Sequence, residues 1–193
     1  TEETYQKDLV PINKYYTPEI QSTNPILYIA VISFNHKKGA IVEFTYPDKE
    51  TLLSKEESKN YITSLCDSQN KEINTIDKIY DNINNQLTNL CMPDGAHSLK
   101  NDSQFFLIQN LKKILYGISV YRQLQTTPAM KEDDQENIRD CVQKAMCIVS
   151  KVPLFGQMAS KLSITMLAYF NQDSLKDKKI IVYLYNNYKI SPM

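Results

Sequence analysis

Hydrophobic residues form an almost unbroken run from Ile26 to Phe34, at the start of a stretch bounded by Pro25 and Pro47. The run is rich in β-branched side chains and too short to cross a bilayer, so it predicts a strand. A strand that is apolar on both faces needs cover on both faces. We therefore expect this segment inside a sheet, and we expect Ile29→Asp or Val31→Asp to prevent folding.

The next segment, residues 40–46, alternates between apolar and polar positions. This pattern is typical of a half-buried strand near the edge of a sheet. It places Glu43 on the more polar face, where a substitution is expected to change stability little. The predicted buried face consists of Ala40, Val42, Phe44 and Tyr46, opposite Ile41 and Thr45. Asn35 and Gly39 supply the chemistry of a hairpin turn between the two strands.

Three further segments carry apolar residues at spacings of three and four, which predicts helices with one buried stripe. The first lies within 73–90 and ends at the turn formed by Pro93, Asp94 and Gly95. The second lies within 155–170. The third runs to Tyr188 and is predicted to begin near Asp173 and Ser174, because both residues are good helix caps.

Strand patterns occupy residues 105–108, 114–124 and 139–151. Gly117 within the second of these predicts a bulge or the close approach of another backbone. The resulting order is β-β-α-β-β-β-α-α, which is an α/β (α+β) sandwich with a sheet between helices. We expect a single domain over residues 25–190, preceded by a polar arm at 1–24. Two polar insertions, 48–72 and 126–137, are expected to be mobile and removable.

The composition contributes mainly exclusions. The chain has 22 basic and 22 acidic residues, so no net charge draws it to nucleic acid, and no nucleic-acid partner is expected. No signal peptide or membrane-spanning run is visible, which favours a cytoplasmic chain. The chain starts without methionine, which indicates a fragment of a longer protein. Cys141 and Cys147 are too far apart along one strand for a disulfide, and free thiols are expected.

The motifs of nucleotide-binding loops, hydrolase nucleophiles and zinc proteases are missing from the sequence. We therefore expect no catalytic residues, no cofactor and no metal site, and the chain itself is not expected to be an enzyme. His36 has the position of a turn residue. A hydrolase that uses Asp94 and His97 is a minor alternative, because side-chain bonds that lock a turn explain this pair more simply.

Several blocks of residues together resemble a known family. They include Phe34–Gly39 with Val42–Pro47, Pro93–His97, Phe105–Phe106, Tyr116–Gln123, Val142–Lys144 and Val149–Leu154. In this order they resemble the amino-terminal module (uDENN) of DENN-superfamily proteins, and among them the Avl-nine family of the late secretory pathway. The resemblance spans roughly Ile26 to Tyr188. It implies a longin-like fold, with five mainly antiparallel strands between helices.

The resemblance also implies a function in vesicle trafficking. DENN proteins are similar to guanine-nucleotide exchange factors for Rab GTPases, in which this module and a following lobe hold the GTPase between them. The following lobe is absent here, so the chain is expected to be half of such a machine. The expected partner contacts are Lys37, Lys38, Tyr121 and Arg122, although Arg122 paired with a neighbouring acidic residue is the simpler structural reading. A non-catalytic longin adaptor is the alternative function. Peripheral association with Golgi or secretory-vesicle membranes through the full-length protein is compatible with both.

Overall fold

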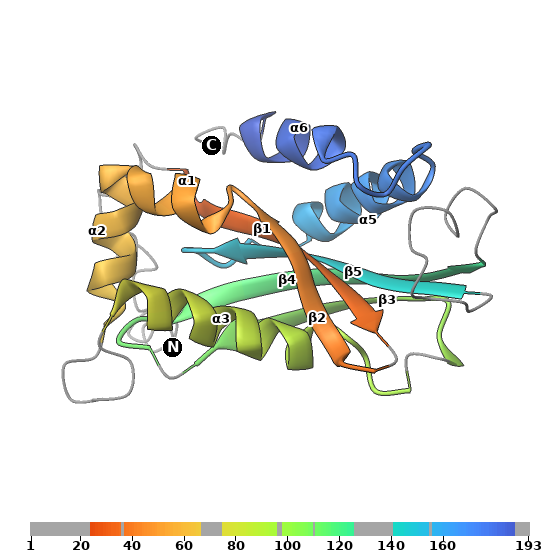
Figure 1. Ribbon diagram of the computed structural model, residues 1–193, viewed down its shortest axis with the longest axis horizontal. Helices are drawn as coiled ribbons and strands as arrows, with labels where there is room; N and C mark the ends of the chain where they lie inside the picture. The colour runs from red at the N-terminus through yellow and green to blue at the C-terminus, as the bar shows by residue number, and fades with distance from the viewer. Residues whose placement is uncertain are drawn as a thin grey trace, which may run out of the picture.

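The computed structural model describes residues 24–35, 37–66, 75–95, 98–109, 111–125, 141–154 and 156–187. In these ranges five strands form one antiparallel sheet in the order β2-β1-β5-β4-β3 (Figure 1). The strands are β1 (Ile26–Asn35), β2 (Gly39–Tyr46), β3 (Asn101–Ile108), β4 (Leu115–Gln125) and β5 (Cys141–Ser150). The described helices are α1 (Lys49–Ser54), α2 (Glu56–Ser64), α3 (Ile76–Leu90), α5 (Gln157–Phe170) and α6 (Lys179–Asn187).

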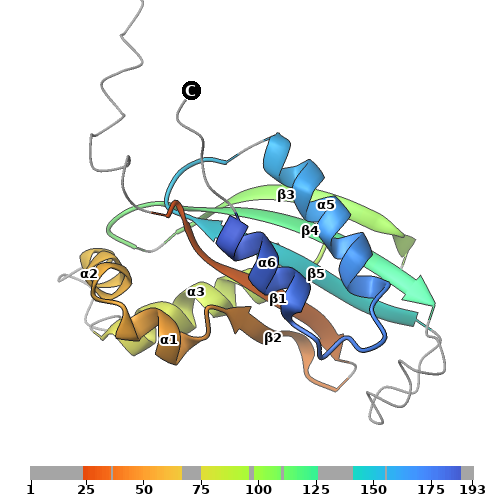
Figure 2. The same ribbon diagram turned by 90° about the horizontal axis from the view of Figure 1, so that it is seen from above.

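Helices cover both faces of the sheet. Figure 2 shows α1 and α3 along one side and α5 and α6 along the other. Each side has its own hydrophobic core. The α3-side core is centred on Tyr28, Ile32, Ile79, Ile83 and Cys147, and the α5-side core on Ile29, Val31, Ile148, Leu162 and Met166. This sandwich confirms the predicted α+β class and agrees with the longin-like fold.

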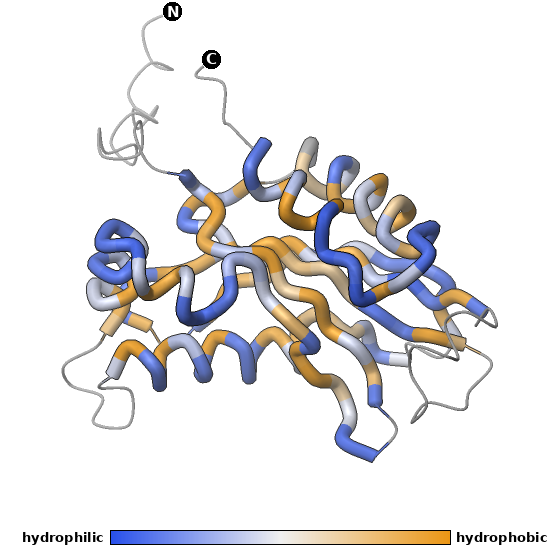
Figure 3. Tube along the Cα trace, turned by 45° about the horizontal axis from the view of Figure 1, so that its top comes forward, coloured by the Kyte–Doolittle hydropathy of each residue, from blue (hydrophilic) through white to orange (hydrophobic). Residues whose placement is uncertain are grey.

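β1 lies between β2 and β5, as its apolar run predicts. Ile29 and Val31 point into the α5-side core, whereas Ala30 and Ile32 point into the α3-side core, and all four side chains are fully buried. The hydropathy trace in Figure 3 shows the hydrophobic stretches gathered in the strands between the helices. Burial on both faces explains why this segment lacks polar alternation.

β2 is an edge strand, but its side chains do not keep to the predicted faces. A β-bulge shifts the register: Val31 pairs with Phe44, whereas Ile32 pairs with Val42. Because the extra residue is Glu43, the alternation reverses there. Ala40 and Val42 pack on the α3-side core, while Phe44 and Tyr46 pack on the α5-side core. The single buried face predicted for β2 is therefore wrong.

The first predicted insertion contributes to the core. Asp48 caps α1 by accepting a 2.8 Å hydrogen bond from the backbone N–H of Thr51. Leu52, Ile62 and Leu65 are fully buried in the α3-side core. The expectation of a mobile, removable segment is therefore wrong for 48–66. Residues 67–72, the insertion 126–137 and residues 1–23 of the arm lie outside the described ranges.

The helices agree with the predicted stripes, with one correction at α6. α3 begins after Thr75, whose hydroxyl accepts from the N–H of Lys78, and buries Ile79, Ile83 and Leu87 at intervals of four. α6 begins at Lys179 instead of near Asp173 and Ser174. Its actual start follows Asp177, whose carboxylate accepts a 2.9 Å bond from the N–H of Lys179. A better cap thus lies closer to the helix than the two predicted ones.

Gly117 pairs with Phe106 across β3 and β4, without a bulge. A Cβ at this glycine would lie 2.1 Å from the Cε2 carbon of the Phe106 ring. The predicted close approach is therefore correct, but the neighbour is an aromatic side chain and not a backbone.

All four cysteines are free thiols, as expected. None of the helices in the described ranges is both long and apolar enough to cross a membrane.

Candidate partner-binding groove

A groove runs between α5 and the strands β3 and β4, on the α5 side of the sheet. Its volume is about 570 Å³. One wall is a face of α5 formed by Ala159, Ser160, Ser163 and Ile164. The other is formed by Asn101, Asp102, Ser103, Val120 and Arg122. Because α5 packs over β4, the edge strand β3 remains uncovered at this side and the groove stays open.

Arg122 is the basic residue that lines this groove, and Asp102 is the acidic one. In register it lies between Asn101 on β3 and Lys144 on β5, so all three side chains start from the same face of the sheet. Its Nε atom is buried and has no hydrogen-bond acceptor among the described residues. Most buried donors in folded proteins are paired, and an unpaired one costs about 1–3 kcal/mol. An acceptor brought by a partner would remove this cost.

Exposed apolar side chains lie on α5 in the groove and along β3 beyond it. Successive residues of β3 alternate between exposed and half-buried, and the exposed ones face the α5 side. Phe105 and Leu107 are 46% and 44% exposed, and Ile164 on α5 is 67% exposed. β3 is also the free edge of the sheet, so its outer backbone groups face away from β4. Exposed apolar side chains beside an open strand edge are typical of a protein-binding surface.

Lys144 and Glu43 form an ion pair beside Arg122. The Lys144 side chain is 7% exposed and that of Glu43 is 31% exposed. The charge of Lys144 is thus neutralised within the fold, whereas Arg122 makes no ion pair with another described residue. Burial, with a smaller contribution from the Glu43 carboxylate, also holds the pKa of Tyr169 in the adjacent core well above its usual range.

The four predicted contact residues do not form one site. Lys37 and Lys38 are exposed at the tip of the β1–β2 hairpin, and their backbone N–H groups donate to the Asn35 side-chain oxygen at 2.9 and 3.1 Å. Tyr121 follows Val120 on β4, points to the opposite face from Arg122 and is 1% exposed in the α3-side core. A side chain buried in this core does not favour a direct contact, and that role of Tyr121 stays a prediction. Only Arg122 lies in the groove.

Sequence reasoning did not identify the helical wall of the groove or the Glu43–Lys144 pair. Ser160, Ser163 and Ile164 recur at intervals of three and four, on the face of α5 opposite the buried Leu162 and Met166. This spacing of the two serines could have indicated the exposed face of the helix. The ion pair had no local signal because its two residues are 101 positions apart in the sequence and meet only across β1. His36 and His97 lie outside the described ranges, so the alternative pair of Asp94 and His97 stays a prediction. In the ranges that the structure describes, no cluster of metal-ligating side chains occurs.

Comparison with known proteins identifies the family. The family model for transport protein Avl9 matches residues 26–192. The chain is 30% identical over 164 residues to late secretory pathway protein AVL9 of Saccharomyces cerevisiae, covering 85% of this chain and 21% of that protein. It is 26% identical over 158 residues to late secretory pathway protein avl9 of Schizosaccharomyces pombe, covering 81% of this chain and 28% of that protein. No solved structure matches. The chain belongs to the Avl9 family and spans less than a third of the length of these curated relatives.

Proposed function

We propose that this chain is the amino-terminal longin-like module of a late-secretory-pathway transport protein, and that it contributes to Rab GTPase binding and guanine-nucleotide exchange in the full-length protein. The observation that carries the proposal is the family match over residues 26–192, since two relatives are named for the late secretory pathway. The five-stranded sheet between helices agrees with the longin-like module of DENN proteins.

Exchange of this kind requires binding and no covalent chemistry. A factor that binds the nucleotide-free GTPase more tightly than the loaded form lowers the affinity of the GTPase for its nucleotide by the same factor. The module therefore needs a surface and not a catalytic centre. The groove supplies the exposed apolar side chain of Ile164 and the unsatisfied buried donor of Arg122. The strand β3 beside it adds an open edge and the exposed side chains of Phe105 and Leu107. A carboxylate or carbonyl oxygen of the GTPase would satisfy that donor.

The test is equilibrium binding across a panel of Rab proteins. The full-length protein is measured against each Rab in its nucleotide-free and GDP-loaded forms. The proposal predicts that the full-length protein binds at least one Rab more tightly in its nucleotide-free form than in its GDP-loaded form. The isolated chain should bind the same Rab more weakly, because half of an interface loses buried area and central contacts. Equal affinity for both nucleotide states across the panel would contradict the proposal.

The open edge of β3 favours a second candidate function, a non-catalytic adaptor that pairs an extended peptide with this strand. In that case binding depends on the edge and its exposed side chains and is independent of nucleotide. Phe105→Glu, at a 46% exposed position, would then abolish capture of the partner peptide. The two functions are separated by whether the bound partner is a GTPase and whether its nucleotide state changes the affinity.

A further inference from the structure

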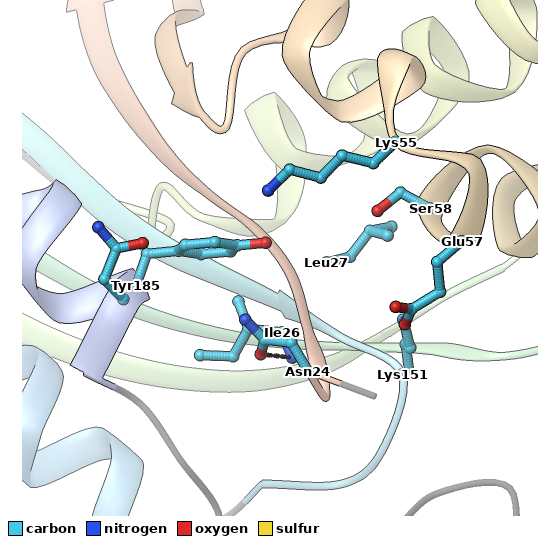
Figure 4. A pocket seen from close by; sticks show the side chains of 9 residues that line it. Asn24, Ile26, Leu27, Lys55, Glu57, Ser58, Lys151 and Tyr185 are labelled. Carbon is cyan, nitrogen blue, oxygen red and sulfur yellow. Dashed lines mark hydrogen bonds and ion pairs between the residues drawn. The ribbon is translucent and has the colours of Figure 1, made fainter. Parts of the chain in front are cut away.

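A second cleft lies where β1 begins and β5 ends, between α2 and α6 (Figure 4). Its volume is about 260 Å³, below the range of roughly 300–1,000 Å³ typical of pockets for drug-sized ligands. The cleft therefore suits a small ligand or one chemical group of a larger one. Its polar lining is Lys55, Glu57, Ser58, Lys151, Tyr185 and Asn186, together with the side chain of Asn24.

Lys151 is a largely buried cation that lines the cleft. Its backbone N–H donates a 2.8 Å hydrogen bond to the carbonyl of Pro25, which fixes its position at the end of β5. The side chain is 12% exposed, with Nζ 4.8 Å from the centre of the Tyr61 ring and 3.5 Å from Glu57 Oε1. Burial lowers the pKa of Lys151, and the nearby Glu57, whose side chain is 60% exposed, opposes this only in part. The one ion pair of Lys151 among the described residues is thus with a carboxylate that is mostly exposed to solvent.

Further donors converge on the cleft from its other walls. Figure 4 shows Lys55 extending into it from the α1–α2 junction, with Ser58 beside it on α2 and Tyr185 on α6 opposite. Within the described part of the chain, the Lys55 ammonium, the Ser58 hydroxyl and the Tyr185 hydroxyl make no ion pair or hydrogen bond. The same holds for the side-chain amide of Asn186. Two lysines and one carboxylate give the lining a net positive charge.

The donors define the chemistry of the ligand. Charged and neutral donors from α2, from α6 and from the end of β5 require a negatively charged group with acceptors in several directions. A carboxylate offers its lone pairs in one plane, whereas the oxygens of a phosphate point to the corners of a tetrahedron. Lysine also binds phosphate readily as a point charge. We propose that this cleft binds a phosphate monoester group, with Lys151 and Lys55 as its cationic contacts and Ser58, Tyr185 and Asn186 as neutral donors.

This site is independent of the Rab proposal, because it lies at the other end of β1 and β5 from Lys37, Lys38 and Arg122. Failure of either proposal leaves the other unaffected.

The probe for the first test is inorganic phosphate, titrated into the isotope-labelled chain at constant ionic strength. The expected result is a saturable shift of the backbone signals of Ser58 and Lys151.

The variants are Lys151→Met and Lys55→Met, each expected to weaken phosphate binding at least tenfold. The matched control is Lys113→Met, because Lys113 also lies over the Tyr61 ring, at 5.7 Å, but does not line the cleft. It is expected to leave the affinity within twofold. Non-saturable shifts, or equal weakening by all three substitutions, would overturn the site, since they would indicate general attraction of anions. Lys55→Met keeps the test decisive if Lys151→Met does not fold.

The phosphate group can come from a lipid headgroup or from a soluble molecule. Vesicles of phosphatidylcholine with phosphatidylinositol 4-phosphate are compared with vesicles in which phosphatidylserine supplies the same charge. Binding to the first only, lost in Lys151→Met and competed by inorganic phosphate, supports a lipid source. Saturable binding of inorganic phosphate without vesicle binding supports a soluble source. Absence of both overturns the proposal.

Discussion

Glu43 on β2 and Lys144 on β5 form an ion pair over β1, the strand that separates theirs in the sheet. Val42 packs on the α3 side, so alternation places the next residue, Glu43, on the α5 side, where Lys144 is almost completely buried. A buried ammonium without a partner is costly, so the carboxylate stabilises the arrangement. Glu43 is exposed, as its sequence pattern predicts, but it also pairs with a buried lysine, so its expected tolerance of substitution stays a prediction.

Replacing Glu43 by glutamine is expected to lower the free energy of unfolding by about 1–3 kcal/mol, because Lys144 stays buried without its counter-ion. Urea unfolding measures the change. The double variant Glu43→Gln with Lys144→Met is expected to recover most of the loss. Glu50→Gln, at an exposed position of α1, is the control and should be neutral. Equal stability of Glu43→Gln and the parent would remove the structural role of the pair.

Ile62→Ala in α2 is expected to cost about 2–5 kcal/mol, since the Ile62 side chain is fully buried in the α3-side core. The cost arises from lost burial and from the cavity left behind. The urea midpoint measures it, with Lys59→Ala on the exposed face of the same helix as the control. A loss below about 0.5 kcal/mol would return α2 to the status of a removable insertion.

Gly117→Ala is expected to destabilise the chain by roughly 1–3 kcal/mol, because the new methyl group would overlap the Phe106 ring. The ring packs on the α3-side core and cannot move away freely. Thermal unfolding of Gly117→Ala, Phe106→Ala and the double variant forms a cycle. The glycine substitution should be nearly neutral in the Phe106→Ala background. If both backgrounds lose the same stability, the steric explanation fails.

Buried tyrosines are expected to make the fold sensitive to alkaline pH. Burial raises the pKa of Tyr61 and of Tyr121 from 10.0 to about 12. The folded state then holds protons that the unfolded state has lost, so stability is fully present below pH 10 and falls between about pH 10 and 12. Urea midpoints at pH 9, 10 and 11 measure the slope. Tyr61→Phe should make it shallower and Tyr183→Phe, at an exposed position, should not. Constant midpoints over this range would contradict the linkage.

The sheet could be predicted from the sequence because its signals are local. The double-sided apolar run of β1, the interval of four in α3 and α5, and the hairpin chemistry at Asn35 and Gly39 each depend on neighbouring residues only. The errors lie where the structure depends on distant contacts. The β2 bulge reverses the faces of Phe44 and Tyr46, and the polar sequence around Leu52 and Ile62 conceals core positions.

The candidate site could be predicted only at Arg122. Alternation along β4 places Tyr121 and Arg122 on opposite faces, but the sequence does not indicate which face is filled by α3 and which stays open beside α5. The groove itself results from the position of α5 over β4, which is a tertiary feature. The cleft with Lys55 and Lys151 is of the same kind, since these residues are nearly a hundred positions apart.

The central proposal, that this chain contributes to Rab nucleotide exchange in the full-length protein, is tested most directly by release of a fluorescent nucleotide from the Rab selected by the binding panel. The isolated chain, the full-length protein and the full-length Arg122→Ala and Lys59→Ala variants are compared. The full-length protein and its Lys59→Ala variant should accelerate nucleotide release, and the isolated chain should not. The Arg122→Ala variant should accelerate release about tenfold less than the full-length parent, which corresponds to a loss of about 1.4 kcal/mol in transition-state stabilisation. Release by the isolated chain at the full-length rate, or no acceleration by the full-length protein, would contradict the account.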